Sequence, residues 1–387
     1  MGNDKRLVII SGFNTRDNNR GTAALGYGSL YFLREKGWLK DDDTLVNFRV
    51  YKNPLKKEYR KHYVSEVKAG NVTYRHIFIN VLFLEKLLFD KLGIYLPFTH
   101  FGKLCKGLRF VAAINGGDGF SDLYSTSTFL SRLPDTLLAM KLKRPVIQLP
   151  QTLGPFKDAT NYKLAEDILK YSSKVYVRDK KFTSELDKMG VKYEETKDLS
   201  YYMQPEPWNI EIKPDAIGIN VSGLAYSNHF RTLQGEFKAY PELINELIAH
   251  FQKMGKPVYL IPHSYCYGSP ETDNDDMVAC KLAFEKLTDK DGAYFIDKDL
   301  ISPQVKYVIS KMTFFIGTRM HANFAAIYTH VPLFGLAYSY KFEGAFNANG
   351  IYNRTTNIVG LKEKDIPNVI EMIDKAYKED VVNGTIQ

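Results

Sequence analysis

Cysteine and long apolar runs are scarce in this chain of 387 residues. The three cysteines, Cys105, Cys266 and Cys280, are too few and too scattered for a disulfide framework or a paired-cysteine metal site. No apolar run approaches the roughly 18 residues that a membrane-spanning helix needs. Residues 1–12 carry charges of both signs before a four-residue apolar run, which predicts a first strand and no signal peptide. We therefore expect a cytoplasmic protein without a bound metal ion.

Nucleotide-cofactor motifs are also missing. Gly26-Tyr27-Gly28 lacks the third glycine of a dinucleotide fingerprint, and the chain contains no phosphate-binding loop of the form GxxxxGKS or GxxxxGKT. No recognised nucleic-acid-binding motif accompanies the basic residues. We therefore expect no bound cofactor and no nucleic-acid partner.

Short apolar runs alternate with stretches of helical periodicity along the chain. We expect strands at residues 7–10, 110–114, 146–149, 174–177, 217–221, 258–261 and 313–316. We expect helices at residues 160–171, 183–189, 242–254, 277–287, 303–312 and 366–377. This alternation predicts an α/β protein whose parallel sheets carry helices on both faces.

The length and composition indicate two globular domains, since 44% of the residues are apolar and 13% aromatic. Residues 205–214 are rich in proline and charge, and a new strand pattern follows them. We predict Rossmann-like domains over residues 1–207 and 214–365 that face each other across a cleft, a GT-B-like architecture. A C-terminal helix and tail over residues 366–387 complete the chain, and the sequence does not decide where that helix packs.

The net charge of +8 is concentrated in one segment. Residues 51–109 contain twelve lysines or arginines and four acidic residues, which accounts for the whole excess. Apolar residues 77–88 and the aromatic run 95–98 lie in the same segment, so we expect a basic, aromatic helical insertion around residues 52–109. Two interpretations stay open: a peripheral membrane surface that binds anionic lipid through the cations of residues 56–61, and a buried basic helical layer.

Three motifs directly follow expected strands of the first domain. Residues 115–119 (NGGDG) offer glycine N–H groups that can line an anion pocket. Residues 151–156 (QTLGPF) form a stiff loop, and Arg178-Asp179 follows the strand at 174–177. Because α/β sheets bind ligands at the carboxyl ends of their strands, we expect these motifs at a site, although a tight turn and a surface Arg–Asp pair are the alternatives.

A strand, turn, helix and strand unit over residues 313–346 dominates the second domain. Its turn contains Arg319, Met320 and His321 at the start of a helix, where free N–H groups and an arginine form a good anion site. Lys341 follows the second strand of this unit and adds a cation at the same edge.

Together these motifs resemble the polysaccharide pyruvyl transferase family. The matching segments, in the order the family expects, are residues 19–21, 115–119, 151–156, 177–179 and 317–341. The resemblance implies transfer of a pyruvyl (carboxyethylidene) group from phosphoenolpyruvate to two hydroxyls of a sugar, forming a cyclic ketal. The acceptor would be a precursor of a bacterial surface polysaccharide or a lipid-linked oligosaccharide.

The resemblance also suggests roles for individual residues. The residues that would bind the donor are Gly117, Arg178, Arg319, Met320 and Lys341. His321 is the hypothetical general acid and base because histidine titrates near neutral pH, with a structural role at the helix start as the alternative. Asp118 would orient an acceptor hydroxyl or remove its proton.

Four polar residues are candidates for binding the acceptor: Asn19, Arg20, Tyr226 and His263. For Gly21 a backbone role alone is favoured. A metal site built on His263 and the acidic residues 271–276 lacks a second histidine or cysteine, so we interpret 271–276 as the solvated start of a helix.

Two other functions stay open. A glycosyltransferase that uses a nucleotide sugar has the same architecture, and Glu343 is a candidate for its ribose-binding carboxylate. A catalytically silent protein of the membrane surface rests on the basic aromatic segment alone.

Overall fold

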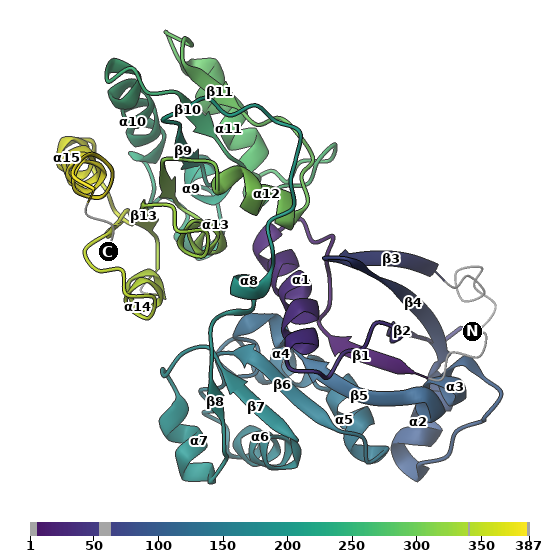
Figure 1. The fold of residues 1–387 in the computed structure, drawn as a ribbon. Coiled ribbons are helices and arrows are strands. Elements are labelled where there is room, and N and C mark those ends of the chain that lie inside the picture. The colour runs from purple at the N-terminus through teal and green to yellow at the C-terminus, as the bar shows by residue number, and fades with distance from the viewer. Residues whose placement is uncertain (1–5, 54–62, 340, 385–387) are drawn as a thin grey trace. The chain divides into compact units, whose positions relative to one another are not determined.

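The computed structural model describes residues 6–53, 63–339 and 341–384, and the chain divides into two compact units (Figure 1). The first unit comprises Met1–Asn14 and Leu25–Met203, and the second comprises Thr15–Ala24 and Gln204–Gln387. The division after Met203 lies close to the proline-rich segment 205–214. Residues 15–24 belong to the second unit, although the predicted first domain contains all of residues 1–207.

The first unit is built on an eight-stranded sheet with the order β3-β4-β2-β1-β5-β6-β7-β8. Its strands are β1 (Leu7–Ser11), β2 (Thr44–Tyr51), β3 (Tyr63–Ala69), β4 (Val72–Leu82), β5 (Leu108–Ala113), β6 (Val146–Gln151), β7 (Lys174–Val177) and β8 (Glu194–Glu195). All neighbours pair in parallel except β3 and β4. Without β3 and β8 the order is that of the doubly wound dinucleotide-binding fold.

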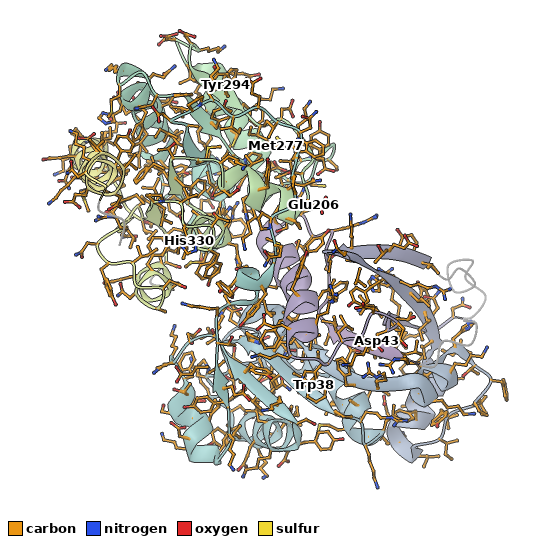
Figure 2. All side chains as sticks on the ribbon, in the orientation of Figure 1. Trp38, Asp43, Glu206, Met277, Tyr294 and His330 are labelled. Carbon is orange, nitrogen blue, oxygen red and sulfur yellow. The ribbon has the colours of Figure 1, made fainter. Side chains whose placement is uncertain are left out.

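Helices surround this sheet and bury its apolar side chains (Figure 2). They are α1 (Arg20–Glu35), α2 (Phe83–Leu92), α3 (His100–Gly107), α4 (Thr126–Ser131), α5 (Pro134–Lys141), α6 (Ala159–Tyr171), α7 (Thr183–Met189) and α8 (Leu199–Tyr202). The first turn of α1 belongs to the second unit. Burial of each strand on both faces explains why β1, β5 and β6 are readable in the sequence as unbroken apolar runs.

The prediction that the basic aromatic insertion is helical is wrong for its first half. Residues 63–82 form the antiparallel strands β3 and β4, and helices occupy only 83–92 and 100–107 of the described part of this segment. The strands are rich in valine, isoleucine and aromatic residues, which favour a pleated surface. Lys68 and Arg75 are exposed, so these cations do not form a buried layer. The cations of residues 56–61 lie outside the described residues.

His76 is a buried titratable group in β4. Its Nε2 lies 2.7 Å from Asn47 Oδ1, and its ring contacts those of Phe13 and Phe78. Burial lowers the pKa of His76 from 6.5 to about 4. On acidification, His76 therefore takes up a proton in the unfolded chain before it does so in the folded one. The contribution of neutral His76 to the free energy of unfolding is complete above pH 6.5 and is lost as the pH falls towards 4.

We expect the first unit to lose at most about 3 kcal/mol of its free energy of unfolding between pH 7 and pH 4 through His76. Urea unfolding of a Trp208→Phe variant measures this, because it leaves Trp38 as the only tryptophan. His76→Gln should flatten the pH dependence, whereas His229→Gln, which removes an exposed histidine, should not. An unchanged pH dependence in His76→Gln would contradict this assignment.

The second unit has a six-stranded parallel sheet with the order β11-β10-β9-β12-β13-β14. The strands are β9 (Ile217–Asn220), β10 (Val258–Leu260), β11 (Ala293–Phe295), β12 (Phe314–Gly317), β13 (Leu333–Ala337) and β14 (Thr355–Asn357). The helices are α9 (Gly223–Ser227), α10 (Tyr240–Lys253), α11 (Asp276–Lys286), α12 (Ser302–Ile309), α13 (Met320–Ile327), α14 (Lys341–Asn347) and α15 (Ile366–Tyr377). The strand order again matches the dinucleotide-binding fold.

The C-terminal helix α15 packs within the second unit. Ile373 and Tyr377 join the apolar cluster that contains Phe251 of α10 and Phe314 of β12. The Tyr377 ring meets both phenylalanine rings edge to face, with centroids 5.6 Å away in each case. This settles the position that the sequence leaves open.

Among the described residues, no helix combines the length and the apolar character needed to cross a membrane.

Candidate functional site

Both sheets have a topological switch point, where the strand order reverses and α/β folds bind their ligands. In the first unit it lies between β1 and β5, and in the second between β9 and β12. The NGGDG motif at residues 115–119 follows β5, and Arg319 follows β12 by two residues. These two sequence motifs therefore lie at the switch points of their own sheets.

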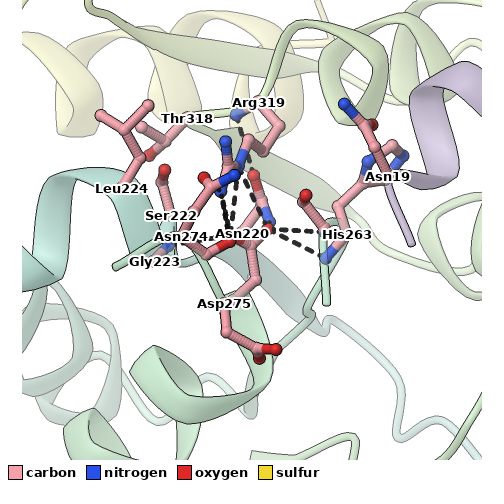
Figure 3. Close-up of polar contacts among 12 residues, drawn as sticks. Asn19, Asn220, Ser222, Gly223, Leu224, His263, Asn274, Asp275, Thr318 and Arg319 are labelled. Carbon is pink, nitrogen blue, oxygen red and sulfur yellow. Dashed lines mark hydrogen bonds and ion pairs between the residues drawn. The ribbon is translucent and has the colours of Figure 1, made fainter. Parts of the chain in front are cut away.

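The turn after β12 is fixed by hydrogen bonds to side chains. The Arg319 backbone N–H donates to Asn220 Oδ1 of β9 at 2.9 Å, which joins the two strands at the switch point (Figure 3). Asn323 Nδ2 of α13 donates to the carbonyls of Gly317 at 3.0 Å and Arg319 at 3.2 Å. A Cβ at Gly317 would lie only 2.2 Å from Asn323 Oδ1, so glycine is required there by close approach.

Arg319 is buried and held by two neighbouring side chains. Its Nη2 donates to Asp276 Oδ1 at 2.7 Å and to Asn274 Oδ1 at 2.7 Å, and its Nε donates to Asp276 Oδ1 at 3.1 Å. Burial acts to lower the pKa of Arg319, but the Asp276 carboxylate outweighs burial and the pKa is raised. The guanidinium is therefore permanently charged, and its orientation is set before any ligand binds.

Asp276 is the functional residue that the sequence interpretation missed. It is fully buried, and besides Arg319 it accepts backbone N–H bonds from Gly223 at 2.8 Å, His263 at 3.1 Å and Ser264 at 2.9 Å. The expected solvated start of a helix at residues 271–276 is thus wrong for its last two members, Asp275 and Asp276, which are both buried. A buried arginine is expected to pair with a carboxylate, but the sequence does not show which Asp or Glu supplies it.

His321 lies in the first turn of α13, beside two other residues of the second unit. A Cβ at Gly21 would lie 2.6 Å from His321 Nδ1, so the backbone of α1 packs directly against the imidazole. His263 is buried, and burial, then the neighbouring His321 and Arg319, hold the pKa of His263 well below its usual value. The arrangement places a partly exposed histidine next to a neutral one, with a fixed cation close by.

Gly21 supplies space for His321. The backbone of Gly21 is not in the left-handed region, so the favoured explanation from backbone geometry does not account for it. We expect Gly21→Ala to displace the imidazole and to lower catalytic turnover by up to about 100-fold, because small misplacements of a reacting group have effects of that size. Gly344→Ala, in α14 with no neighbour within 4 Å of the added atom, is the matched control.

Equal turnover in Gly21→Ala and Gly344→Ala, with both proteins folded, would show that the position of His321 does not matter.

The predicted acceptor residues differ in their surroundings. Asn19 is exposed, and its Oδ1 accepts the N–H of Gly21 at 2.9 Å. Arg20 is buried against the Tyr265 ring, with its guanidinium carbon 4.1 Å from the centroid. Four N–H bonds of Arg20 already go to Leu300, Asp299 and the backbone of residues 17 and 18.

These bonds give Arg20 a structural role at the start of α1, and its contact with an acceptor stays a prediction. Tyr226 is likewise a core residue of the second unit, where its hydroxyl is buried and has no hydrogen-bond partner among the described residues. Asn19 and His263 are the predicted acceptor residues that lie with Arg319 in Figure 3. Met320 begins α13 and is partly buried. Lys341 begins α14, and its side chain lies outside the described residues.

In the first unit the structure brings Gly117, Asp118 and Arg178 together. A Cβ at Gly117 would lie 3.1 Å from Arg178 Nη1, so the glycine backbone covers the guanidinium. Arg178 Nη1 donates to the buried Asp198 at 2.7 Å, and Nε donates to Thr152 at 3.2 Å. Burial acts to lower the pKa of Arg178, but the Asp198 carboxylate outweighs burial, and the pKa is raised. The Asp118 carboxylate also raises it. The surface Arg–Asp pair considered from the sequence is therefore a partly buried network.

Backbone conformation explains the first two glycines of the NGGDG motif. Asn115, Gly116 and Gly117 all have positive φ, at 50°, 72° and 89°, which few residues other than glycine and asparagine adopt. Both side-chain polar atoms of Asn115 are buried, and within the described residues they have no hydrogen-bond partner. Leaving such atoms unpaired costs about 1–3 kcal/mol, which is the kind of strain found at binding sites.

Among the described residues, no group of three or more His, Cys, Asp or Glu side chains is arranged to hold a metal ion. At the switch point of the second unit, the fixed Arg319, the N–H groups at the start of α13 and the histidines suit an anionic group and proton transfer near neutral pH. At the switch point of the first unit, Arg178 and the Asp118 carboxylate offer a second fixed cation and a candidate base.

Two solved structures with a similar fold are UDP-GlcNAc 2-epimerases. UDP-GlcNAc 2-epimerase from Methanocaldococcus jannaschii superposes with a TM-score of 0.53 at 13% identity, over 95% of this chain and 92% of that chain. The enzyme from Neisseria meningitidis, bound to UDP-GlcNAc, gives 0.51 at 11% identity, over 99% and 94%. At such identities the likeness concerns the fold alone, and it confirms the predicted α/β architecture of two Rossmann-like, GT-B-like units.

The sequence also matches a family. The signature described as polysaccharide pyruvyl transferase covers residues 19–340, well over half of the chain, and the protein therefore belongs to this family. It is also 19% identical over 280 residues to the amylovoran biosynthesis protein AmsJ of Erwinia amylovora. That match spans 68% of this chain and 65% of the length of the relative.

Proposed function

We propose that this protein transfers a pyruvyl group from phosphoenolpyruvate to two hydroxyls of a sugar in a polysaccharide or lipid-linked oligosaccharide precursor. The observation that carries the proposal is a buried, pre-oriented Arg319 at the switch point of the second unit, two residues before His321. Membership of the polysaccharide pyruvyl transferase family supports the same reaction class. We propose a cytoplasmic setting, as the low cysteine content suggests.

Arg319 is suited to one anionic group of the donor. Its contacts with Asp276 and Asn274 use Nε and Nη2, and the guanidinium also hydrogen-bonds Tyr338, so a donor anion would bind beside Tyr338 or take its place. The Asp276 carboxylate removes much of the net positive charge, so affinity would come from fixed geometry and from the N–H groups at the start of α13. Arg178, as the second donor-binding arginine, stays a prediction, as does Lys341.

The reaction requires two coupled bond changes at the same carbon of phosphoenolpyruvate. In the first, one sugar hydroxyl adds to C2, its proton is removed, and a proton is delivered to the methylene carbon C3, which becomes a methyl group. In the second, the neighbouring hydroxyl replaces the phosphate at C2, which leaves as inorganic phosphate while that hydroxyl loses its proton. The product is the cyclic ketal.

His321 is proposed to carry these protons, because imidazole acts as acid and base near neutral pH. The neutral His263 beside it avoids a second positive charge and can accept a hydrogen bond from an acceptor hydroxyl. Asp118, whose Oδ2 accepts the Tyr124 hydroxyl at 2.8 Å, remains the candidate base of the first unit.

The test is release of inorganic phosphate from phosphoenolpyruvate in the presence of a panel of glycosides and extracted lipid-linked oligosaccharides. We expect release that depends on the acceptor, with a carboxyethylidene methyl signal in the NMR spectrum of the product. Arg319→Lys, which keeps the charge and loses the planar fork, should raise the half-saturating donor concentration. Phosphate release without any acceptor-dependent product would contradict the proposal.

A glycosyltransferase that uses a nucleotide sugar is the second candidate function, and one observation favours it. A cavity of ≈ 630 Å³ in the second unit is lined by Glu343, Tyr338, Asn353 and Thr355, among other polar residues. A carboxylate in such a cavity can accept hydrogen bonds from the two hydroxyls of a ribose. The same contact would suit an acceptor sugar, so the donor must be identified by direct binding.

A further inference from the structure

The helix α2 and the loop after it present a row of apolar side chains to solvent. Leu84, Leu88 and Leu92 are spaced by four residues and therefore lie along one face of the helix. Their exposed fractions reach 69% and 65% for the outer two, and Phe98 in the following loop is 72% exposed. We define the α2 ridge as the exposed apolar residues of this segment: Phe83, Leu84, Leu88, Leu92, Ile94, Leu96 and Phe98.

The α2 ridge is an ordered part of the first unit. On an adjacent face of α2, Phe89 is buried and meets the Phe101 ring edge to face at 5.4 Å. Gly93 ends α2 in the left-handed conformation, and its N–H donates to Phe89 O at 2.8 Å. Thr99 caps α3 by accepting the Gly102 N–H at 2.9 Å. The exposed side chains are thus held outward by a folded scaffold.

Exposed lysines occur in the same segment as the α2 ridge, in α2 and α3, while the acidic side chains of α2 are already engaged. Asp90 accepts from Lys86 at 2.5 Å, and Glu85 accepts the hydroxyl of Thr99. Lys91, Lys103 and Lys106 are exposed, and no ion pair with a described residue involves them. Apolar side chains flanked by unneutralised lysines are the pattern of a protein surface that enters an anionic lipid interface.

We propose that the α2 ridge is a membrane-docking surface that inserts its leucines and Phe98 among the head groups of anionic lipids. The apolar residues would lie below the phosphate level, and the lysines would lie at it. A second copy of this chain is a poorer occupant, because a symmetric contact would bring these lysines together. Nucleic acid is disfavoured, since leucine and isoleucine offer neither base stacking nor hydrogen bonds. This inference does not rest on the proposed reaction.

Flotation of the full chain with lipid vesicles tests the proposal. We expect binding to vesicles of phosphatidylcholine that contain about 30% phosphatidylglycerol. Binding to vesicles of phosphatidylcholine alone should be at least roughly tenfold weaker. Leu88→Ser/Leu92→Ser/Phe98→Ser should reduce binding to the anionic vesicles at least roughly tenfold. The matched control is Leu130→Ser/Leu137→Ser, which changes exposed leucines of the first unit outside the α2 ridge.

A second measurement does not depend on the serine variant being folded. Phe98→Trp, in a Trp38→Phe/Trp208→Phe background, should shift its emission to shorter wavelength with anionic vesicles and be quenched by brominated lipid. Leu130→Trp in the same background should do neither. Absence of vesicle binding by the wild-type chain, or equal binding by the ridge and control variants, would overturn the proposal. A dimer that the ridge substitutions dissociate, without lipid binding, would assign the surface to a second copy instead.

Discussion

Asp276→Ala is expected to lower the free energy of unfolding of the second unit by about 3–5 kcal/mol, because it leaves the buried Arg319 without its carboxylate. The same change removes the acceptor for the backbone N–H groups of Gly223, His263 and Ser264. Since these groups come from two segments around the switch point, one after β9 and one after β10, the loss affects the site and the stability together. We therefore also expect weaker binding of phosphoenolpyruvate.

Urea unfolding in a Trp38→Phe background measures this effect, because Trp208 of the second unit is then the only tryptophan. The matched control is Asp275→Ala. Asp275 is also buried; it caps α11 by accepting the N–H groups of Met277 and Val278, and its other oxygen accepts those of Cys266 and Glu271. Its removal should cost about 2 kcal/mol, less than that of Asp276, because no buried arginine loses its carboxylate. Equal effects of the two substitutions would show that Asp276 acts only as part of the helix start.

His321→Ala is expected to lower catalytic turnover by about 10²–10⁴-fold, the usual contribution of a general acid or base. Binding of phosphoenolpyruvate should change by no more than a few fold, because Arg319 has its own supports in Asp276 and Asn274. The free energy of unfolding should also change little, since the imidazole is partly exposed. Steady-state kinetics, calorimetric titration and urea unfolding of the same preparation measure the three quantities.

The control is His229→Ala, which removes an exposed histidine of the second unit. If His321→Ala unfolds the second unit, the histidine has a structural role in packing against Gly21, and another group must move the protons. Folded His321→Ala with wild-type turnover would remove the histidine from the mechanism altogether.

The fold was largely accessible from the sequence because the central strands of a parallel sheet are buried on both faces. Residues 174–177 and 313–316 are recognisable as short apolar runs for this reason, and they match β7 and β12 within one residue. The edge of the first sheet was not accessible. In β4 polar and apolar residues mix because one of its faces is partly exposed, and the run from Ile77 onwards passes from strand to helix without a break in hydrophobicity.

The site was accessible only in part, because sequence motifs mark where strands end and not which segments meet. Arg319 and the NGGDG motif could be located, since both follow strands at the switch points. The pairing of Arg319 with Asp276 and the contact of His321 with Gly21 could not. Both join segments far apart in the sequence, and neither Asp276 nor Gly21 has a local pattern that distinguishes it from other helix-start residues.

Direct binding identifies the donor without knowledge of the acceptor. Thermal unfolding is followed during titration with phosphoenolpyruvate and, separately, with a panel of nucleotide sugars, because a ligand of the native state raises the melting temperature as its concentration exceeds the dissociation constant. We predict a saturable rise with phosphoenolpyruvate that Arg319→Lys weakens, and no rise with nucleotide sugars. A rise with a nucleotide sugar and none with phosphoenolpyruvate would contradict the proposed function and favour the glycosyltransferase.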